Sequence, residues 1–180
     1  KMDFTRKACF VAGSHTTTAP SSLTYSSVIL RDSVRLAFLI AALNDIDIMS
    51  CDLENAYLNA PCREKIWFEG GLECGEDRGK VCVVVRSLYG LKSAGAAFRS
   101  SLAQILRDLG YESSRADPDV WMQKAVRDDG HQYYEMLFVY VDDILALSHR
   151  AKEAIEEITV FYKVKDGSIK PPDIYLGANV

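Results

Sequence analysis

The sequence lacks the features of several common protein classes. Its five cysteines include no Cys-x-x-Cys pair, and an odd number does not make a complete disulfide framework. The ligand spacing of a structural zinc site is also missing. No apolar stretch approaches the roughly 20 residues of a membrane-spanning helix, and the first residues do not lead into the hydrophobic region of a signal peptide. We therefore expect a protein of a reduced compartment, with no membrane association and no address of its own.

The chain is also short of positive charge. It has 180 residues, with 21 Lys and Arg against 25 Asp and Glu, and a formal net charge of −4. A free-standing nucleic-acid-binding domain is usually basic, so this balance argues mildly against one. It does not exclude an enzyme that meets nucleic acid through a local basic strip. The length predicts one domain, or one domain plus a fragment.

Two adjacent aspartates, Asp142 and Asp143, interrupt the most apolar run of the chain, which extends from Met136 to Leu147. Neighbouring residues on a strand point to opposite faces. Within one continuous buried strand, at least one carboxylate would therefore lie in a core, where an unpaired charge is very costly. The sequence thus predicts a tight β-hairpin with apolar strands and with the aspartates at its turn, on the rim of a sheet.

The hydrophobic pattern elsewhere predicts helices and strands without regular βαβ alternation. We expect helices over residues 32–44, 93–109 and 151–162. We also expect a short helical turn over residues 53–58. Besides the hairpin, we expect strands over residues 46–52, 65–68, 81–85, 120–126 and 174–176. This order indicates an α+β fold, in which an antiparallel sheet is backed by helices.

A third carboxylate, Asp52, lies at the end of the strand expected over residues 46–52. Nucleotidyl transfer by two metal ions needs carboxylates that hold the ions about 3.5–4 Å apart. Each Mg²⁺ takes one or two carboxylates together with phosphate oxygens. Three aspartates from two adjacent strands can bridge two such ions. The spacing alone leaves equally open that Asp52 and the Asp142–Asp143 pair lie on unrelated surface turns.

Five short segments resemble, in the same order, motifs of one enzyme family. The segments are Cys51–Asn59 (against MDVKTAFLNG), Ser87–Ala94 (SLYGLKQAP), Gly110–Pro118 (GF..SKADP), Tyr140–Asp143 (Y-x-D-D) and Ile174–Gly177 (YFLG). A lone Y-x-D-D is a weak signal, but the order and spacing match over roughly residues 7–177. The chain therefore resembles the reverse transcriptase domain of copia-type LTR retrotransposons.

The resemblance implies a right-hand polymerase, with residues 1–180 forming its fingers and palm and with the thumb and ribonuclease H absent. It implies an RNA-directed DNA polymerase that adds dNTPs to a primer 3′-hydroxyl on an RNA or DNA template. Asp52, Asp142 and Asp143 would be the catalytic residues and, with the Leu53 carbonyl, would bind two Mg²⁺ or Mn²⁺ ions. Further implied partners are the thumb, ribonuclease H and integrase of the same polyprotein. The implied location is the cytoplasm, in a retroelement particle, or the nucleus.

The resemblance also implies contacts with the substrates. Tyr57 would lie against the sugar and exclude a 2′-hydroxyl, although the residue alone would be interpreted as a core aromatic. Gly90 would let the backbone approach the templating pair. The full set of expected substrate-binding residues is Leu53, Tyr57, Tyr89, Gly90, Lys92, Tyr140, Val141 and Lys7. Among these, Tyr140 and Val141 would pack beneath the primer end, while a lone Lys such as Lys92 is more often a solvated surface charge.

Two departures from the family pattern keep other hypotheses open. Cys9 stands where an Arg is expected to hold the triphosphate, with Arg6 or Lys7 as substitutes, and the segment after Lys92 changes the family's Gln, Pro, Arg and Trp. A degenerate or truncated copy that acts as a binding or assembly module is therefore the second hypothesis. The third is another palm-type nucleotidyl transferase, such as a nucleotide cyclase. Tyr57 argues against this one, because cyclising a free nucleotide does not need it.

Overall fold

The computed structural model describes residues 10–13, 17, 20–21, 23–176 and 178–179. The chain divides into two compact units. The first comprises Lys1–Tyr25 and Tyr57–Phe98, and the second comprises Ser26–Ala56 and Arg99–Val180. We call them the hairpin unit and the sheet unit after their main elements. No helix in the described part of the chain is long and apolar enough to cross a membrane.

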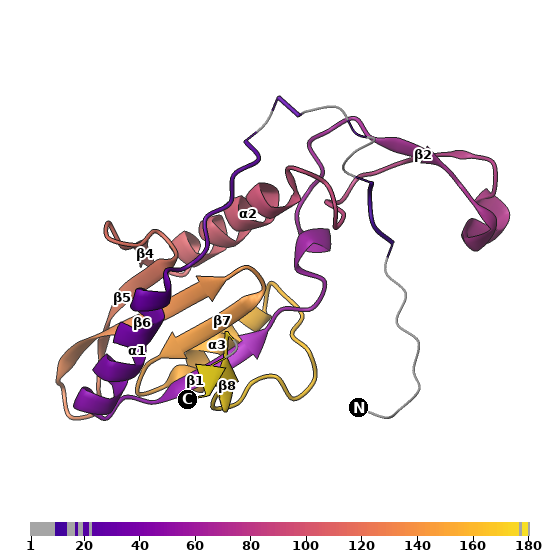
Figure 1. The fold of residues 1–180 in the computed structure, drawn as a ribbon. Coiled ribbons are helices and arrows are strands. Elements are labelled where there is room, and N and C mark those ends of the chain that lie inside the picture. The colour runs from indigo at the N-terminus through magenta and orange to yellow at the C-terminus, as the bar shows by residue number, and fades with distance from the viewer. Residues whose placement is uncertain (1–9, 14–16, 18–19, 22, 177, 180) are drawn as a thin grey trace. The chain divides into compact units, whose positions relative to one another are not determined.

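The sheet unit is built on a five-stranded antiparallel sheet with the strand order β1-β7-β6-β5-β4 (Figure 1). Its strands are β1 (Ile48–Asp52), β4 (Glu112–Ser113), β5 (Val120–Val126), β6 (Gln132–Tyr140) and β7 (Asp143–Leu147). Strands β6 and β7 form the expected hairpin, and β1 pairs with the outer side of β7. This topology places the end of β1 beside the β6–β7 turn.

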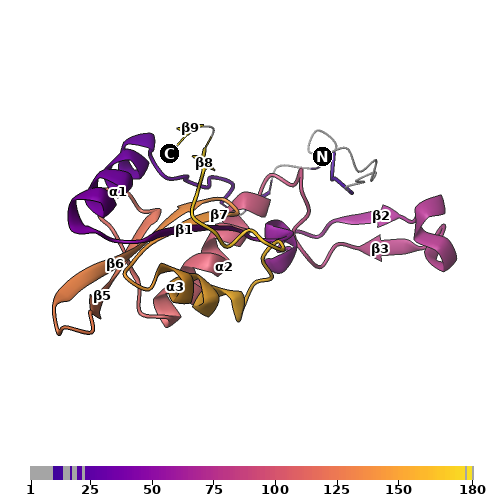
Figure 2. The same ribbon diagram turned by 90° about the horizontal axis from the view of Figure 1, so that it is seen from below.

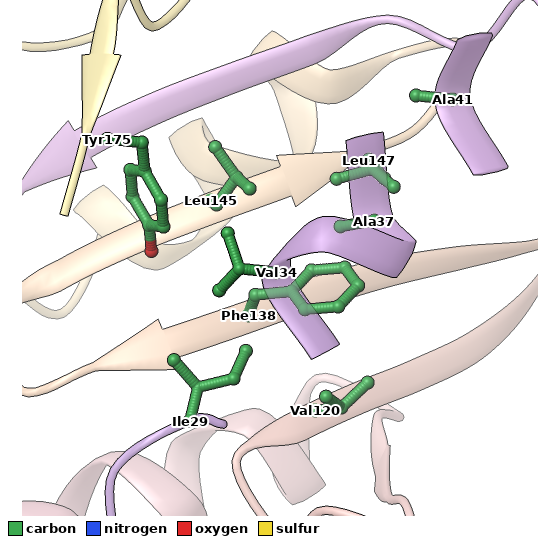
Figure 3. Close-up of a cluster of buried hydrophobic side chains, with 9 residues drawn as sticks. All are labelled: Ile29, Val34, Ala37, Ala41, Val120, Phe138, Leu145, Leu147 and Tyr175. Carbon is green, nitrogen blue, oxygen red and sulfur yellow. The ribbon is translucent and has the colours of Figure 1, made fainter. Parts of the chain in front are cut away.

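One face of the sheet is covered by α1 (Arg31–Asn44) and by β8 (Ile174–Tyr175), which pairs with β9 (Ala178–Asn179). Alternate residues of β5, β6 and β7 point to this face and pack with α1, as strand geometry requires. Figure 3 shows the resulting cluster, which consists of Ile29, Val34, Ala37, Ala41, Val120, Phe138, Leu145, Leu147 and Tyr175.

The N-terminus of α1 is held by a carboxylate that is distant in sequence. Leu30 occupies the N-cap position and has no side-chain oxygen, so it cannot cap the helix. Asp117 Oδ2 instead accepts a hydrogen bond from the Leu30 N–H at 2.9 Å and from the Ser33 hydroxyl at 2.6 Å. The Asp117 side chain is buried. Asp117 thus anchors α1 to the loop that precedes β5.

The opposite face is covered by α3 (Ala151–Thr159) and by the part of α2 (Ala94–Asp108) that belongs to the sheet unit (Figure 2). Its fully buried side chains come from the helices and from the other alternate positions of the strands: Leu102, Leu106, Leu137, Ile144, Ile155 and Ile158. Helix α3 carries apolar residues at Ile155 and Ile158, one turn apart, as expected for an amphipathic helix.

The hairpin unit contains a second, two-stranded sheet, formed by β2 (Trp67–Glu69) and β3 (Val81–Val83) and connected through η2 (Leu72–Asp77). A short 3₁₀ helix, η1 (Ala56–Asn59), follows β1 and spans the boundary between the two units. The core of the hairpin unit is a small cluster around Val84, Leu91 and Ala94.

These elements confirm the expected mixture of helices with an antiparallel sheet. The three predicted helices are present, although α3 ends at Thr159 rather than Tyr162. Strand β4 was not predicted, because it consists of two exposed residues, which are too few to show an alternation of apolar and polar side chains. Strand β6 starts at Gln132, ahead of the apolar run, because its polar first half pairs with β5.

Candidate active site

The β6–β7 turn differs from the prediction in one respect. Asp143 is the first residue of β7 and pairs with Tyr140, so the two loop residues are Val141 and Asp142 rather than the two aspartates. Val141 has a φ of 55°. A positive φ at the first position of a two-residue hairpin is normally supplied by glycine, and it is a strained conformation for a β-branched residue. The backbone of this turn is therefore held in place by the strands that flank it.

The sheet brings the predicted carboxylates to one edge. Asp52, the last residue of β1, is the direct cross-strand partner of Asp143. Such partners point to the same face, with their Cβ atoms about 4.5–5.5 Å apart. The Leu53 N–H donates to the Asp142 carbonyl at 2.8 Å, which ties the end of β1 to the turn. Asp52, Asp142 and Asp143 thus lie together where the two strands end.

Negative charge accumulates at this edge. The pKa of Asp143 is raised to about 6, first by burial and then by the charges of Asp142 and Asp52, with Lys165 opposing the shift. Like charges placed directly opposite on neighbouring strands are destabilising. A cation bound between the carboxylates would relieve both the repulsion and the cost of burial.

Lys165 supplies one such positive charge. Its ammonium donates to Asp52 Oδ2, and its backbone N–H donates to the Asp52 carbonyl at 3.0 Å. The pKa of Lys165 is raised, chiefly by this side-chain hydrogen bond. The sequence provides no local signal for the pair, since its members are 113 positions apart.

The other carboxylate oxygen of Asp52, Oδ1, is buried and has no hydrogen-bond partner among the described residues. A buried acceptor without a partner is unfavourable by roughly 1–3 kcal/mol. Carboxylate oxygens are the ligands that Mg²⁺ prefers. The orphaned oxygen and the surplus negative charge therefore suit a divalent cation.

The three carboxylates do not, however, form a finished metal site in this arrangement. Within the described ranges, no group of three or more His, Cys, Asp or Glu side chains is placed to hold one ion. Asp52 and Asp143 share a face, whereas Asp142 lies in the turn. Metal binding by all three would require their side chains to reorient.

Two tyrosines accompany the carboxylates. Tyr140 precedes the turn and, as the partner of Asp143, lies on the same face of the sheet. Tyr175 of β8 is buried, and its hydroxyl has no hydrogen-bond partner in the part of the chain that the structure describes. The pKa of Tyr175 is raised, first by burial and then by the charge of Asp143. Tyr175 belongs to the Ile174–Gly177 segment, whose resemblance to the family motif implies no role for this residue.

The remaining predicted substrate residues belong to the hairpin unit. The Tyr57 ring packs against the Tyr89 ring, with centroids 4.6 Å apart, and against Phe98, with centroids 6.1 Å apart. It also contacts the cluster around Leu91. These contacts fit the interpretation of Tyr57 as a core aromatic, and they fix the position of its ring.

Gly90 and Lys92 both meet the N-terminal part of the chain. Gly90 has a φ of 90°, and a Cβ at this position would overlap the Ala12 carbonyl oxygen. The Ala12 N–H donates to the Tyr89 carbonyl at 2.8 Å. The Lys92 ammonium donates to the Thr17 carbonyl at 3.1 Å. The absence of a side chain at Gly90 thus makes room for Ala12.

The three positions predicted to concern the triphosphate, Arg6, Lys7 and Cys9, lie outside the described residues. Ser93 directly precedes α2 and donates its hydroxyl to Glu64.

Comparison with known proteins extends these observations. The profile of the family described as reverse transcriptase (RNA-dependent DNA polymerase) matches residues 3–180. The chain is 28% identical over 123 residues to the retrovirus-related Pol polyprotein from transposon TNT 1-94 of Nicotiana tabacum. It is 28% identical over 148 residues to the Pol polyprotein from transposon RE1 of Arabidopsis thaliana.

The alignments cover 67% and 79% of this chain but only 9% and 10% of those two relatives. The chain thus spans about a tenth of the length of the polyproteins that it matches. The profile match over nearly all residues confirms the resemblance to copia-type enzymes, and the chain belongs to the reverse transcriptase (RNA-dependent DNA polymerase) family.

Proposed function

We propose that this chain is the catalytic part of an RNA-directed DNA polymerase, with the sheet unit as its palm and the hairpin unit as its fingers. The observation that carries the proposal is the register of Asp52 against Asp143, with Asp142 in the adjoining turn. The family match adds the reaction class, RNA-dependent DNA polymerisation. The reaction proposed for this chain is the extension of a primer 3′-hydroxyl with dNTPs on an RNA or DNA template.

In this proposal Asp52, Asp142, Asp143 and the Leu53 carbonyl hold two Mg²⁺ or Mn²⁺ ions. When bound, such ions lower the pKa of the attacking hydroxyl and stabilise charge on the transferred phosphoryl group. The buried Oδ1 of Asp52 and the raised pKa of Asp143 support these assignments. The protein contributes the rigid β1–β7 edge, which fixes the carboxylates at adjacent positions.

Each predicted substrate residue is assigned a contact. Tyr140 and Val141 support the primer end from the sheet unit. Tyr57 selects deoxynucleotides, and its packing against Tyr89 supports this role because a selective contact requires a fixed ring. Template and phosphate contacts are assigned to Tyr89, Gly90, Lys92 and Lys7. Since Gly90 already makes room for Ala12, its template contact would include that neighbouring segment.

The names of the relatives suggest further partners. Both are Pol polyproteins about ten times longer than the region they share with this chain. We propose that the thumb, ribonuclease H and integrase of such a polyprotein act together with this domain. The corresponding location is a cytoplasmic retroelement particle, or the nucleus during integration.

Primer extension on an RNA template tests the proposal. We expect the wild-type chain to extend the primer with Mg²⁺ and Asp142→Asn to lose at least about 100-fold in rate, because charge stabilisation at the reacting centre is usually the largest catalytic contribution. Asp128→Asn is the matched control, since Asp128 lies at the exposed β5–β6 turn of the same sheet. Equal extension by the wild type and Asp142→Asn would refute the proposal.

A second candidate function is a non-catalytic remnant that acts as a binding or assembly module. The observation that favours it is the lack of a preformed three-residue metal group among the described side chains. Isothermal titration calorimetry with dNTP and Mg²⁺ separates the two candidates. A polymerase binds the nucleotide in a metal-dependent way, whereas tight binding of this kind is not expected of the remnant.

A further inference from the structure

The segment that follows α3 runs antiparallel to the end of β1. The Glu54 N–H donates to the Lys163 carbonyl at 2.7 Å, and the Lys165 N–H donates to the Asp52 carbonyl at 3.0 Å. Leu53 and Val164 form a bridge between these two hydrogen bonds. The backbone therefore fixes Lys165 opposite Asp52 and Lys163 opposite Glu54.

This register produces two neighbouring ion pairs, which differ in solvent exposure and in the carboxylate that they involve. The Lys163 ammonium lies 2.8 Å from Glu54 Oε2, and its side chain is 77% exposed. The Lys165 ammonium bonds Asp52 Oδ2, with the two side chains 49% and 30% exposed. Only the second pair involves a residue of the carboxylate edge.

An ammonium and a divalent cation compete for the same carboxylate lone pairs. Asp52 Oδ2 is engaged by Lys165, and Oδ1 is buried without a partner among the described residues. A metal ion shared by Asp52 and Asp143 would meet the positive charge of Lys165 at the same carboxylate. Lys165 has a flexible four-carbon side chain, and its partial exposure gives the ammonium a path into solvent.

We propose that Lys165 is an internal counter-ion that holds Asp52 in the metal-free protein and competes with a divalent cation for that carboxylate. The contact is thus autoinhibitory toward metal loading. The inference rests on the proposed function, because it takes Asp52 to be a metal ligand. It adds a role for a residue outside the carboxylate set.

The expected size of the effect follows from the exposure of the pair. Exposed ion pairs contribute about 0.2–1 kcal/mol, and the upper half of this range applies here because Asp52 is only 30% exposed. Removal of Lys165 should therefore tighten metal binding about two- to fivefold. Lys163→Met removes the same charge two residues away without freeing Asp52. At an ionic strength of about 1 M, where the Debye length is about 3 Å, screening leaves little of its long-range effect.

The test is a Mn²⁺ titration of the 180-residue chain, followed by the electron paramagnetic resonance signal of free Mn²⁺. We expect Lys165→Met to bind Mn²⁺ about two- to fivefold more tightly than the wild type and Lys163→Met to bind it as the wild type does. In an Asp52→Asn background, Lys165→Met should have no further effect. Lys165→Gln is a second variant that retains a polar head should Lys165→Met fail to fold.

Three results would overturn the inference. The folded Lys165 variants could bind Mn²⁺ with the same affinity as the wild type, or more weakly than the wild type. Alternatively, Lys163→Met could tighten Mn²⁺ binding as much as Lys165→Met does. In each of these cases the wild type still binds Mn²⁺, so the proposed function stands. If no variant binds Mn²⁺, the proposed function itself is refuted and the inference falls with it.

Discussion

Replacing Asp117 tests whether this residue of the Gly110–Pro118 segment stabilises the fold. This buried carboxylate accepts hydrogen bonds from Leu30 N–H and the Ser33 hydroxyl, and from Asp119 N–H at 3.1 Å. It also places a negative charge near the N-terminus of α1, where the helix dipole favours it. Asp117→Ala would leave these donors without their acceptor and α1 without a cap.

The magnitude follows from these contacts. Hydrogen bonds to a charged group contribute about 1.5–3 kcal/mol each, and loss of an N-cap typically costs about 0.5–2 kcal/mol. Because the three bonds share one carboxylate, their contributions do not add fully. We expect Asp117→Ala to lower the free energy of unfolding by about 2–4 kcal/mol.

The assay is urea denaturation monitored by circular dichroism, with Asp128→Ala as the exposed control. The control should stay within about 0.5 kcal/mol of the wild type. A Ser33→Ala variant should cost less than Asp117→Ala, and the double variant should cost less than the sum, because both remove the same hydrogen bond. A loss below about 0.5 kcal/mol for Asp117→Ala would refute the capping role.

Three further predictions concern the carboxylate edge and two backbone conformations. The pKa of Asp143 is raised to about 6 by burial and by the charges of Asp142 and Asp52, with Lys165 opposing the shift. Between about pH 4 and 6 the folded state therefore keeps the proton of this carboxyl, whereas the unfolded state has lost it. The free energy of unfolding consequently falls as the pH rises through that window. Asp143→Asn should become more stabilising relative to the wild type from pH 4 to pH 6 in urea titrations, and a constant difference would contradict the assigned cause. Gly90→Ala should lower the melting temperature more than Gly79→Ala does, because both glycines have a positive φ but only Gly90 lies against Ala12. Equal changes in the melting temperature of the two variants, measured by calorimetry, would show that the contact with Ala12 is not important. Val141→Gly should raise the free energy of unfolding by up to about 1 kcal/mol, because relief of the strained φ exceeds the added backbone entropy of the unfolded chain. A variant that is less stable than the wild type in the same calorimetry would show that the packing of the Val141 side chain outweighs the strain.

The free-energy cost of burying a carboxylate was sufficient to predict the β6–β7 hairpin from the sequence, because few backbone conformations keep two adjacent charges inside an apolar run out of the core. The same reasoning placed both aspartates in the turn, although Asp143 pairs in β7. The position of the turn depends on Val141 adopting a positive φ. A β-branched residue gives no sequence signal for that conformation, so a shift of one residue could not be foreseen.

The features missed at the site are those set by distant pairing. Lys165 faces Asp52 because residues after α3 return along the edge of β1, and no periodicity within residues 160–170 predicts that register. The sequence presents Lys163 and Lys165 as equivalent, alternating surface charges. Only the partner strand distinguishes them, since one lies opposite Glu54 and the other opposite a residue of the carboxylate edge. A comparison of the two lysine variants therefore measures what the fold adds to the sequence at this site: the same chemical change, two positions apart, should alter metal binding at one position alone.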